Sequence, residues 1–265
     1  MRKLSLEEIK IIEVNILDHI SDICKKHNLK YFLAYGTLIG AIRHKGFIPW
    51  DDDIDIVMPR KDYEVLIEIL KSQRGTSKYD CLIPLEGDYF YEFAKVIDSS
   101  TIVHEQKTIS SRCGVWVDIF PLDGLRKDDK LSYYNLLLLN RCRAASVNLR
   151  FPHKTTGYAV PFEYMFWKFC RLIGYKIFLK GIVRLSQKYK YDDCKYVGFA
   201  SSYPANKKYM LKKWFEDSVE VPFEDKKFIA PIGFDEYLRT EYGDYMKLPP
   251  ENERVSHGMN AFIIE

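Results

Sequence analysis

The amino-acid sequence predicts an α+β fold with a mixed sheet as its core, flanking helices, and a helical or irregular C-terminal part. Three observations lead to this prediction. Apolar residues recur at helical spacing near the N-terminus, short runs alternate apolar and polar residues as strands do, and two long helical patterns follow those runs. The chain has 265 residues, 47% of them hydrophobic, which is enough to bury a sizeable core. We expect a core over residues 1–125 and a second region over residues 126–265 packed on it.

Helices are predicted on both sides of the first strands. Ser5 and Glu8 form a capping-box pattern, and isoleucines at helical spacing extend this first helix to Lys26, with Asn28 as its stop. The same kind of spacing predicts another helix over residues 62–71. Both patterns are amphipathic, so we expect these helices to pack on the sheet.

Four short runs have the alternation or the apolar content of strands. Pro121 is expected to end the last of them, because proline removes a hydrogen bond from the ladder. The predicted strands cover residues 31–35, 79–83, 89–97 and 115–120.

The C-terminal half is predicted to be mainly helical, with helices over residues 128–149, 162–189 and 236–242. Between Tyr164 and Tyr191 lysine and arginine are the only charged residues, and they are mixed with aromatic side chains. Such a pattern is typical of a core helix with a solvated charged side. The alternative is a peripheral contact of residues 162–189 with an anionic membrane surface.

The composition limits the classes of function. The net charge of +3 gives no sign of nucleic-acid binding, so we expect no nucleic-acid partner. The six cysteines form no C-x-x-C pair and are expected to be reduced. Neither a signal peptide nor an apolar run long enough to span a bilayer is present in the sequence. We therefore expect a cytoplasmic protein, with a peripheral contact at the inner face of the plasma membrane as the further expectation.

The strongest chemical signal is the run DDDIDIVM, in which Asp53 and Asp55 alternate with isoleucine. Side chains two apart on a strand share a face, so these carboxylates would lie about 6–7 Å apart and repel each other unless a cation lies between them. Oxygen ligands of this type suit Mg²⁺ or Mn²⁺. Asp51 is a candidate outer ligand, whereas Asp52 lies on the opposite parity.

A small-residue turn precedes these acids. Gly36 and Thr37 would open a short helix, and Gly40 and Arg43 fall on the same helical face as Gly36. The glycines let a ligand approach the backbone, the threonine offers a hydroxyl, and the arginine offers a counter-charge for phosphate oxygens. The alternative is that Gly40 permits close packing and Arg43 is a surface charge.

Asp118 interrupts the apolar run over residues 115–120. A buried carboxylate is unfavourable unless it is paired or metal-bound, so we predict that Asp118 is the third acid of the site, on a strand adjacent to that of Asp53 and Asp55. The alternative is a carboxylate that is exposed or caps a turn. Asp123, next to Gly124, is interpreted as a turn residue.

Three blocks of the sequence resemble the LicD family of phosphocholine transferases, which is related to the fukutin-related proteins. The first is YGTLIGAIRHKGFIPWDDDIDIVMPRKDY, the second is GVWVDIFPLDG, and the third is VPFEDKKFIAPIGFDEYLRTEYGDYMKLPP, followed by Arg254 and His257. The order strand, Gly-Thr, helix and Asp-x-Asp strand is similar to the nucleotidyltransferase fold. The resemblance implies a nucleotidyltransferase-like catalytic core over residues 1–125 and a substrate-binding region over residues 126–265. It also implies that His257 belongs to the site.

The resemblance further implies a metal-dependent enzyme that moves phosphocholine from CDP-choline to a sugar hydroxyl. The acceptor would be a glycan or a lipid-linked glycan, such as a teichoic acid or lipopolysaccharide precursor. Asp53, Asp55 and Asp118 would then be catalytic, with Asp118 completing a metal site or acting as the base. Aromatic faces for the choline group would come from Trp50, Tyr89, Tyr91 and Trp116.

Other functions remain open. They are a nucleotidyltransferase acting on a sugar phosphate or small molecule, a transferase of another CDP-linked alcohol phosphate, a metal-dependent glycosyltransferase, and a binding protein without turnover.

Overall fold

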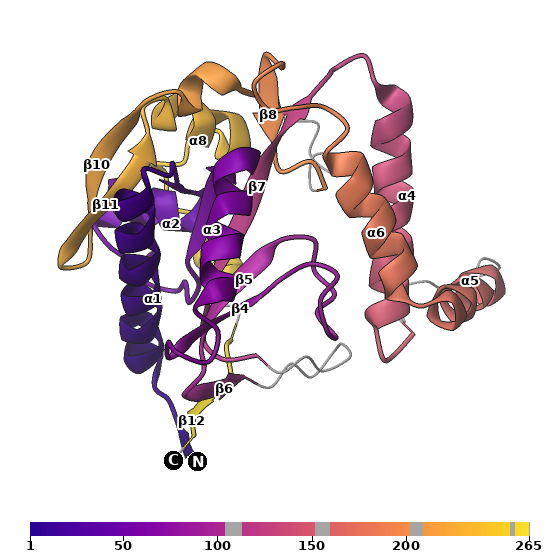
Figure 1. Ribbon diagram of the computed structural model, residues 1–265, viewed down its shortest axis with the longest axis horizontal. Coiled ribbons are helices and arrows are strands. Elements are labelled where there is room, and N and C mark those ends of the chain that lie inside the picture. The colour runs from indigo at the N-terminus through magenta and orange to yellow at the C-terminus, as the bar shows by residue number, and fades with distance from the viewer. Residues whose placement is uncertain (104–112, 152–159, 202–208, 255–257, 265) are drawn as a thin grey trace.

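The structure, a computed structural model, describes residues 1–103, 113–151, 160–201, 209–254 and 258–264. Its centre is a mixed sheet that has seven strands among these residues (Figure 1). Strands β3 and β7 run parallel, and the other pairs in this sheet are antiparallel. The order is β2 (Phe32–Leu33), β3 (Asp55–Pro59), β7 (Trp116–Leu125), β5 (Ala94–Asp98) and β4 (Tyr79–Leu82), and β8 (Tyr196–Gly198) joins β7 to β9 (Met210–Leu211). The predicted α+β class is confirmed.

The described residues also form two smaller sheets. A hairpin of β10 and β11 lies beside the main sheet, and a three-stranded sheet brings the two ends of the chain together (Figure 1). Because β1 pairs with β12, the N-terminal and C-terminal segments lie side by side. These strands are β1 (Arg2–Lys3), β6 (Thr101–Val103), β10 (Ser218–Phe223), β11 (Lys226–Pro231) and β12 (Ala261–Ile263).

Helices α1 and α3 cover one face of the sheet, whereas α4, α5 and α6 form a separate group at its side (Figure 1). Helix α1 has the predicted capping box at Ser5 and ends at Asn28 in the left-handed conformation (φ 54°). Within the described ranges the α-helices are α1 (Leu6–His27), α2 (Tyr35–Ile39), α3 (Arg60–Ser72), α4 (Lys130–Val147), α5 (Val160–Ile173), α6 (Tyr175–Ser186) and α8 (Phe234–Tyr242). The part of the chain that the structure describes also contains a π-helix (Gly40–His44) and two 3₁₀ helices (Lys212–Phe215 and Glu251–Glu253).

One large apolar core joins the N-terminal and C-terminal parts of the chain. Buried side chains of α1, β3 and α3 share it with Phe223 and Phe228 of the β10–β11 hairpin and Tyr237 of α8. A smaller cluster lies between Leu125 of β7, Leu136 of α4 and Ile182 of α6. Residue 125, where we expected the two parts to divide, is the last residue of the strand β7.

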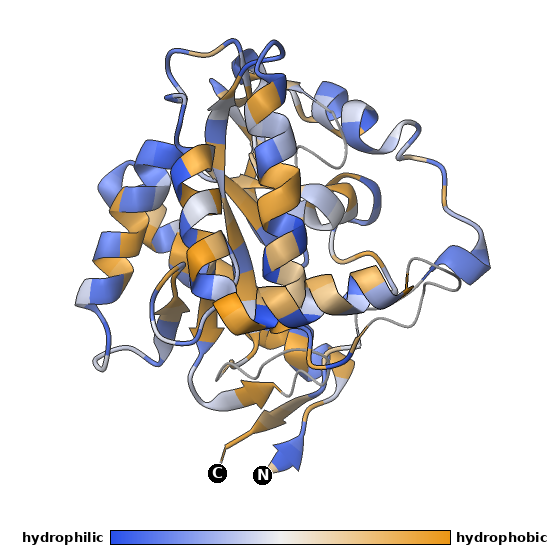
Figure 2. Cartoon of the chain, turned by 90° about the vertical axis from the view of Figure 1, so that its right-hand side faces the viewer, coloured by the Kyte–Doolittle hydropathy of each residue, from blue (hydrophilic) through white to orange (hydrophobic). Residues whose placement is uncertain are grey.

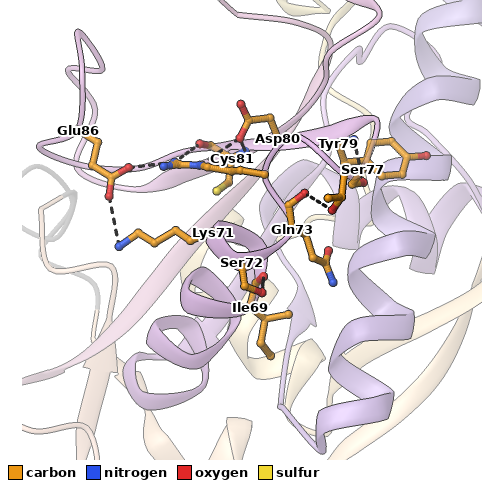
Figure 3. Close-up of polar contacts among 11 residues, drawn as sticks. Ile69, Lys71, Ser72, Gln73, Ser77, Tyr79, Asp80, Cys81 and Glu86 are labelled. Carbon is orange, nitrogen blue, oxygen red and sulfur yellow. Dashed lines mark hydrogen bonds and ion pairs between the residues drawn. The ribbon is translucent and has the colours of Figure 1, made fainter.

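A polar network fixes the edge of the sheet (Figure 3). The guanidinium of Arg74 lies 3.2 Å from Asp80 and 2.9 Å from Glu86, and it donates to the carbonyl of Cys81 at 2.8 Å. Lys71 reaches the same Glu86 carboxylate at 3.2 Å. These contacts tie the end of α3 to the edge strand β4 and to the turn that follows it.

The prediction that Pro121 ends its strand is wrong, because β7 continues through it to Leu125. The N–H of Asp118 faces β3, where it donates to the carbonyl of Ile54, so the nitrogen of Pro121 faces the other flank. On that flank β5 stops pairing at Ile119 and β8 begins at Asp123. The missing N–H of the proline therefore falls in a gap between two partner strands.

The same extension overturns the interpretation of Asp123 as a turn residue. Asp123 is a buried residue of β7, and its carboxylate accepts two hydrogen bonds from the guanidinium of Arg60, at 2.7 and 2.6 Å. Arg60 begins α3 directly after β3. This bidentate pair holds the ends of the two parallel strands together.

Three further predicted boundaries need correction. The helix expected over residues 162–189 is two helices, because Gly174 has a φ of 84° between them, a conformation that favours glycine. Strand β5 begins at Ala94, so Tyr89 and Tyr91 precede it. Strand β3 begins at Asp55, so Asp53 lies in the segment before the strand.

Candidate active site

The two parallel strands at the centre of the sheet bring two carboxylates together. Asp55, the first residue of β3, is the register partner of Asp118 on β7. Neighbouring strands lie about 4.8 Å apart, and residues in register point to the same face. The predicted adjacency of these two strands is confirmed, although the residues are separated by more than sixty positions in the chain.

The electrostatics of this cluster are unfavourable without a cation. Burial raises the pKa of the Asp55 carboxyl well above its usual value, and the negative charges of Asp53 and Asp118 raise it further. The ammonium of Lys95 opposes this effect. A positive charge placed among these acids would therefore be strongly stabilised.

The turn before β3 positions the acids. The N–H of Asp55 donates to the hydroxyl of the buried Thr37 at 2.8 Å, so this side chain fixes the start of the strand. A Cβ atom at Gly36 would lie 2.6 Å from Oδ2 of Asp51. Gly36 thus leaves room for the carboxylate of Asp51 beside the turn. The neighbouring Asp52 is buried and accepts a hydrogen bond from the N–H of Met259 at 2.9 Å.

Gly40 and Arg43 have contacts that sequence spacing could not show. They lie in the π-helix, where a Cβ atom at Gly40 would collide with the carbonyl of Gly46. The guanidinium of Arg43 donates to the carbonyl of Tyr245 at 2.6 Å and, more weakly, to that of Lys247 at 3.4 Å. The structure therefore gives Gly40 a packing role and ties Arg43 to the segment after α8. The phosphate-binding role of both stays a prediction.

Lys95 is a site residue that sequence reasoning did not single out. Its Nζ lies 2.8 Å from Oδ1 of Asp118, and both side chains are almost fully buried. It is the register partner of Asp118 on the antiparallel strand β5. The sequence signal was a single lysine within the apolar run AKVI, since a lysine that is buried needs a partner.

The aromatic candidates fall into two groups. The Nζ of Lys95 lies 3.8 Å from the ring centre of Trp116 and 5.2 Å from that of Tyr91, whose ring is 5.6 Å from that of the buried Tyr89. Trp50 lies elsewhere, under the guanidinium of Arg254 at 5.0 Å. His257 lies outside the described residues. The structure thus places the rings of Trp116 and Tyr91 beside Lys95, and that of Tyr89 beside Tyr91.

A fourth acid, Glu13 on α1, was not expected. It is fully buried, and neither of its carboxyl oxygens has a hydrogen-bond partner among the described residues. Burial raises its pKa well above the usual value, and the charges of Asp53 and Asp52 raise it further. Sequence spacing placed Glu13 on the apolar face of α1, between Ile9 and Ile16, and this was the signal that could have found it.

The raised pKa of Glu13 leads to a prediction about stability. A carboxyl whose pKa is higher in the folded than in the unfolded state lowers the free energy of unfolding as the pH rises above its unfolded value of about 4.3. The variant Glu13→Gln has no such group. We expect its Tm to exceed that of the original protein at pH 8 and this difference to vanish near pH 4, measured by calorimetry without metal.

The exposed Glu64 of α3 offers a control for this prediction, because Glu64→Gln should leave the Tm unchanged at both pH values. A Glu13→Gln variant that is less stable than the original protein at pH 8 would mean that the Glu13 carboxylate has a favourable charged partner.

The acids fit a divalent cation in charge and in ligand type. No group of three or more His, Cys, Asp or Glu side chains in the described part of the chain is arranged to hold a metal ion. Mg²⁺, however, is commonly held by only one or two carboxylates, with substrate phosphates and water as its other ligands. Asp55 and Asp118 supply two carboxylates in register, and Asp53 is near enough to raise the pKa of Asp55.

Comparison with known proteins identifies the family of the chain. A family model described as LicD/FKTN/FKRP, nucleotidyltransferase domain, matches residues 28–137, which include Asp53, Asp55 and Asp118. The chain is 32% identical over 273 residues to the lipopolysaccharide cholinephosphotransferase LicD of Haemophilus influenzae, and the match covers 100% of each chain.

Two shorter matches are to rickettsial proteins. The chain is 47% identical over 49 residues to the uncharacterized protein RP689 of Rickettsia prowazekii, which covers 18% of each chain. It is 35% identical over 63 residues to the uncharacterized protein RT0683 of Rickettsia typhi, which covers 23% of this chain and 20% of the relative. The full-length match carries the assignment, and the resemblance seen in the three sequence blocks is confirmed: the chain belongs to the LicD family.

Proposed function

We propose that this protein is a Mg²⁺-dependent transferase that moves phosphocholine from CDP-choline to a sugar hydroxyl of a cell-surface glycan precursor. The full-length similarity to a lipopolysaccharide cholinephosphotransferase supports the transferred group and the class of acceptor. The observation that supports the chemistry is the register pairing of Asp55 with Asp118, because two carboxylates on neighbouring strands suit a divalent cation that binds a diphosphate.

The acids would hold Mg²⁺ or Mn²⁺, with Asp53, Asp55 and Asp118 as ligands and Asp51 as an outer ligand. The metal, when bound, neutralises the charge that develops on the leaving CMP. Asp118 either completes this ligand set or accepts the proton of the attacking hydroxyl. Thr37 holds the backbone of Asp55 in place, since its hydroxyl accepts a hydrogen bond from the N–H of that residue.

The rings beside Lys95 are the best candidates for the choline group. Quaternary ammonium groups are recognised by the faces of aromatic rings. Trp116 and Tyr91 already present their faces to an ammonium, that of Lys95, within 6 Å. Trp50 and Tyr89 remain candidates for the choline group, and His257 remains a candidate substrate-binding residue. All six cysteines are free and buried, which supports the further proposal that the enzyme acts in the cytoplasm.

The proposal predicts the products. With CDP-choline, Mg²⁺ and phosphocholine-free lipopolysaccharide or lipid-linked teichoic acid precursor, we expect CMP and phosphocholine-modified glycan in equal amounts, detected by chromatography and mass spectrometry. Removal of Mg²⁺ by a chelator should abolish both.

Two other outcomes would contradict this assignment. Release of pyrophosphate from CTP in the presence of a sugar phosphate would identify an ordinary nucleotidyltransferase. Faster turnover of CDP-ethanolamine or of a CDP-linked polyol than of CDP-choline would identify another group as the natural one to be transferred.

A further inference from the structure

The helix α5 carries an exposed apolar stripe on its outer face. The four side chains recur at intervals of three and four residues, which places them on one side of the helix. Their exposed fractions are 76% for Phe162, 67% for Met165, 59% for Phe169 and 86% for Leu172. Single exposed apolar residues are common on protein surfaces, but four large ones in one stripe are not.

The opposite side of α5 is fixed to α4, so the stripe has a defined direction. Cys170 is fully buried, the indole of Trp167 donates to the carbonyl of Asn148 at 3.3 Å, and Arg171 donates to the same carbonyl at 2.7 Å. Helix α5 crosses the ends of α4 and α6, and apolar and polar colours alternate along it (Figure 2). The group α4–α6 lies at the side of the molecule (Figure 1).

Glu163, in its first turn, is the one acid of α5, and the charges around the rest of this stripe are positive. Lys168 lies beside it on α5, and Lys176, Lys180 and Arg184 are exposed on α6. No acidic residue occurs between Tyr164 and Tyr191. A second copy of the chain would present the same positive charges and be repelled, whereas an anionic lipid surface is complementary to them.

The apolar surface extends beyond α5. More than half of the large apolar side chains that are exposed in the described residues lie between Leu131 and Ile177. On α4 these include Leu131, Tyr134 and Leu138, again at helical spacing. Among the described residues, no helix has both the length and the apolar content that crossing a bilayer requires.

We propose that α5 and α6 form a membrane-binding surface, in which α5 lies in the plane of an anionic bilayer with Phe162, Met165, Phe169 and Leu172 in contact with the acyl boundary. The lysines of α6 contact lipid phosphates. This inference rests on the exposed stripe and its charges and holds whichever group the active site transfers.

The test is flotation of the full chain with vesicles of phosphatidylcholine alone and of phosphatidylcholine mixed with phosphatidylglycerol. The original protein should float with the anionic vesicles at low salt and less at high salt. The double variant Met165→Gln/Leu172→Gln should lower the partition coefficient about tenfold or more, because each side chain loses its transfer from water. Lys176→Gln/Lys180→Gln should lower it about fivefold for each charge removed.

The control is Ile11→Gln, which removes a side chain of similar exposure (62%) from α1 and should float as the original protein does. Thermal melting confirms that each variant is folded. Absence of flotation at low salt would overturn the proposal. So would a loss of flotation in Ile11→Gln equal to that in Met165→Gln/Leu172→Gln. It would also be overturned by a lipid-free dimer in sedimentation that Met165→Gln/Leu172→Gln dissociates, because the stripe would then be an interface between two copies.

Discussion

Replacement of Asp55 by asparagine is expected to lower kcat for phosphocholine transfer by about 10³-fold or more, while the protein stays folded. The change removes one of two carboxylates that lie in register on parallel strands, so under the proposed function the cation and the diphosphate would lose a ligand at the reacting centre. The amide keeps the size of the side chain, and the N–H of residue 55 can still donate to Thr37. Release of CMP, followed under saturating CDP-choline and Mg²⁺, gives the measurement.

The stability of the same variant separates a catalytic from a structural role. Because burial and the charges of Asp53 and Asp118 raise the pKa of Asp55, the neutral amide relieves repulsion at neutral pH. Asp55→Asn should therefore melt at or above the temperature of the original protein without metal, and it should bind Mg²⁺ more weakly in calorimetry. The exposed Asp88 gives the matched control, since Asp88→Asn should change neither quantity. Full turnover in Asp55→Asn would remove Asp55 from the ligand set.

Local sequence patterns were sufficient to predict much of the fold. The capping box at Ser5, the stop at Asn28 and the end of α8 at Tyr242 depend on residues close together in the chain, and each is found where expected. The adjacency of the Asp118 strand and the Asp55 strand was also predicted, because a carboxylate within an apolar strand needs a partner.

Contacts between distant residues could not be predicted in this way. The pairing of Lys95 with Asp118 depends on the register of β5 against β7, and the burial of Glu13 depends on how α1 lies on the sheet. The passage of β7 through Pro121 depends on where its two partner strands stop. The hydrogen bond from the Arg43 guanidinium to the carbonyl of Tyr245 depends on a π-helix and on a segment far away in the chain, and the phosphate-binding role of Arg43 stays a prediction. Each of these depends on a second segment that local periodicity does not describe.

The variant Lys95→Met is expected to destabilise the protein by about 3–5 kcal/mol at neutral pH. Lys95 and Asp118 form an ion pair at 2.8 Å with side chains only 4% and 11% exposed, so methionine leaves a buried carboxylate beside Asp55 without its ammonium partner. Denaturant unfolding without metal gives the free energy. The double variant Lys95→Met/Asp118→Asn removes both charges and should recover much of the loss, which tests that the effect arises from the pair rather than from packing of the lysine stem.

Mg²⁺ then tests whether Asp118 is a metal ligand or serves only in the ion pair with Lys95. If Asp118 is a metal ligand, the ammonium of Lys95 and the divalent cation are alternative partners of one carboxylate, so Lys95→Met should bind Mg²⁺ more tightly than the original protein. A ligand that binds the folded state raises its stability by an amount that increases with the affinity, and Mg²⁺ should therefore raise the Tm of Lys95→Met by more than it raises that of the original protein. Equal shifts in the two proteins would mean that Asp118 serves only the ion pair. The cation would then depend on Asp53 and Asp55 alone.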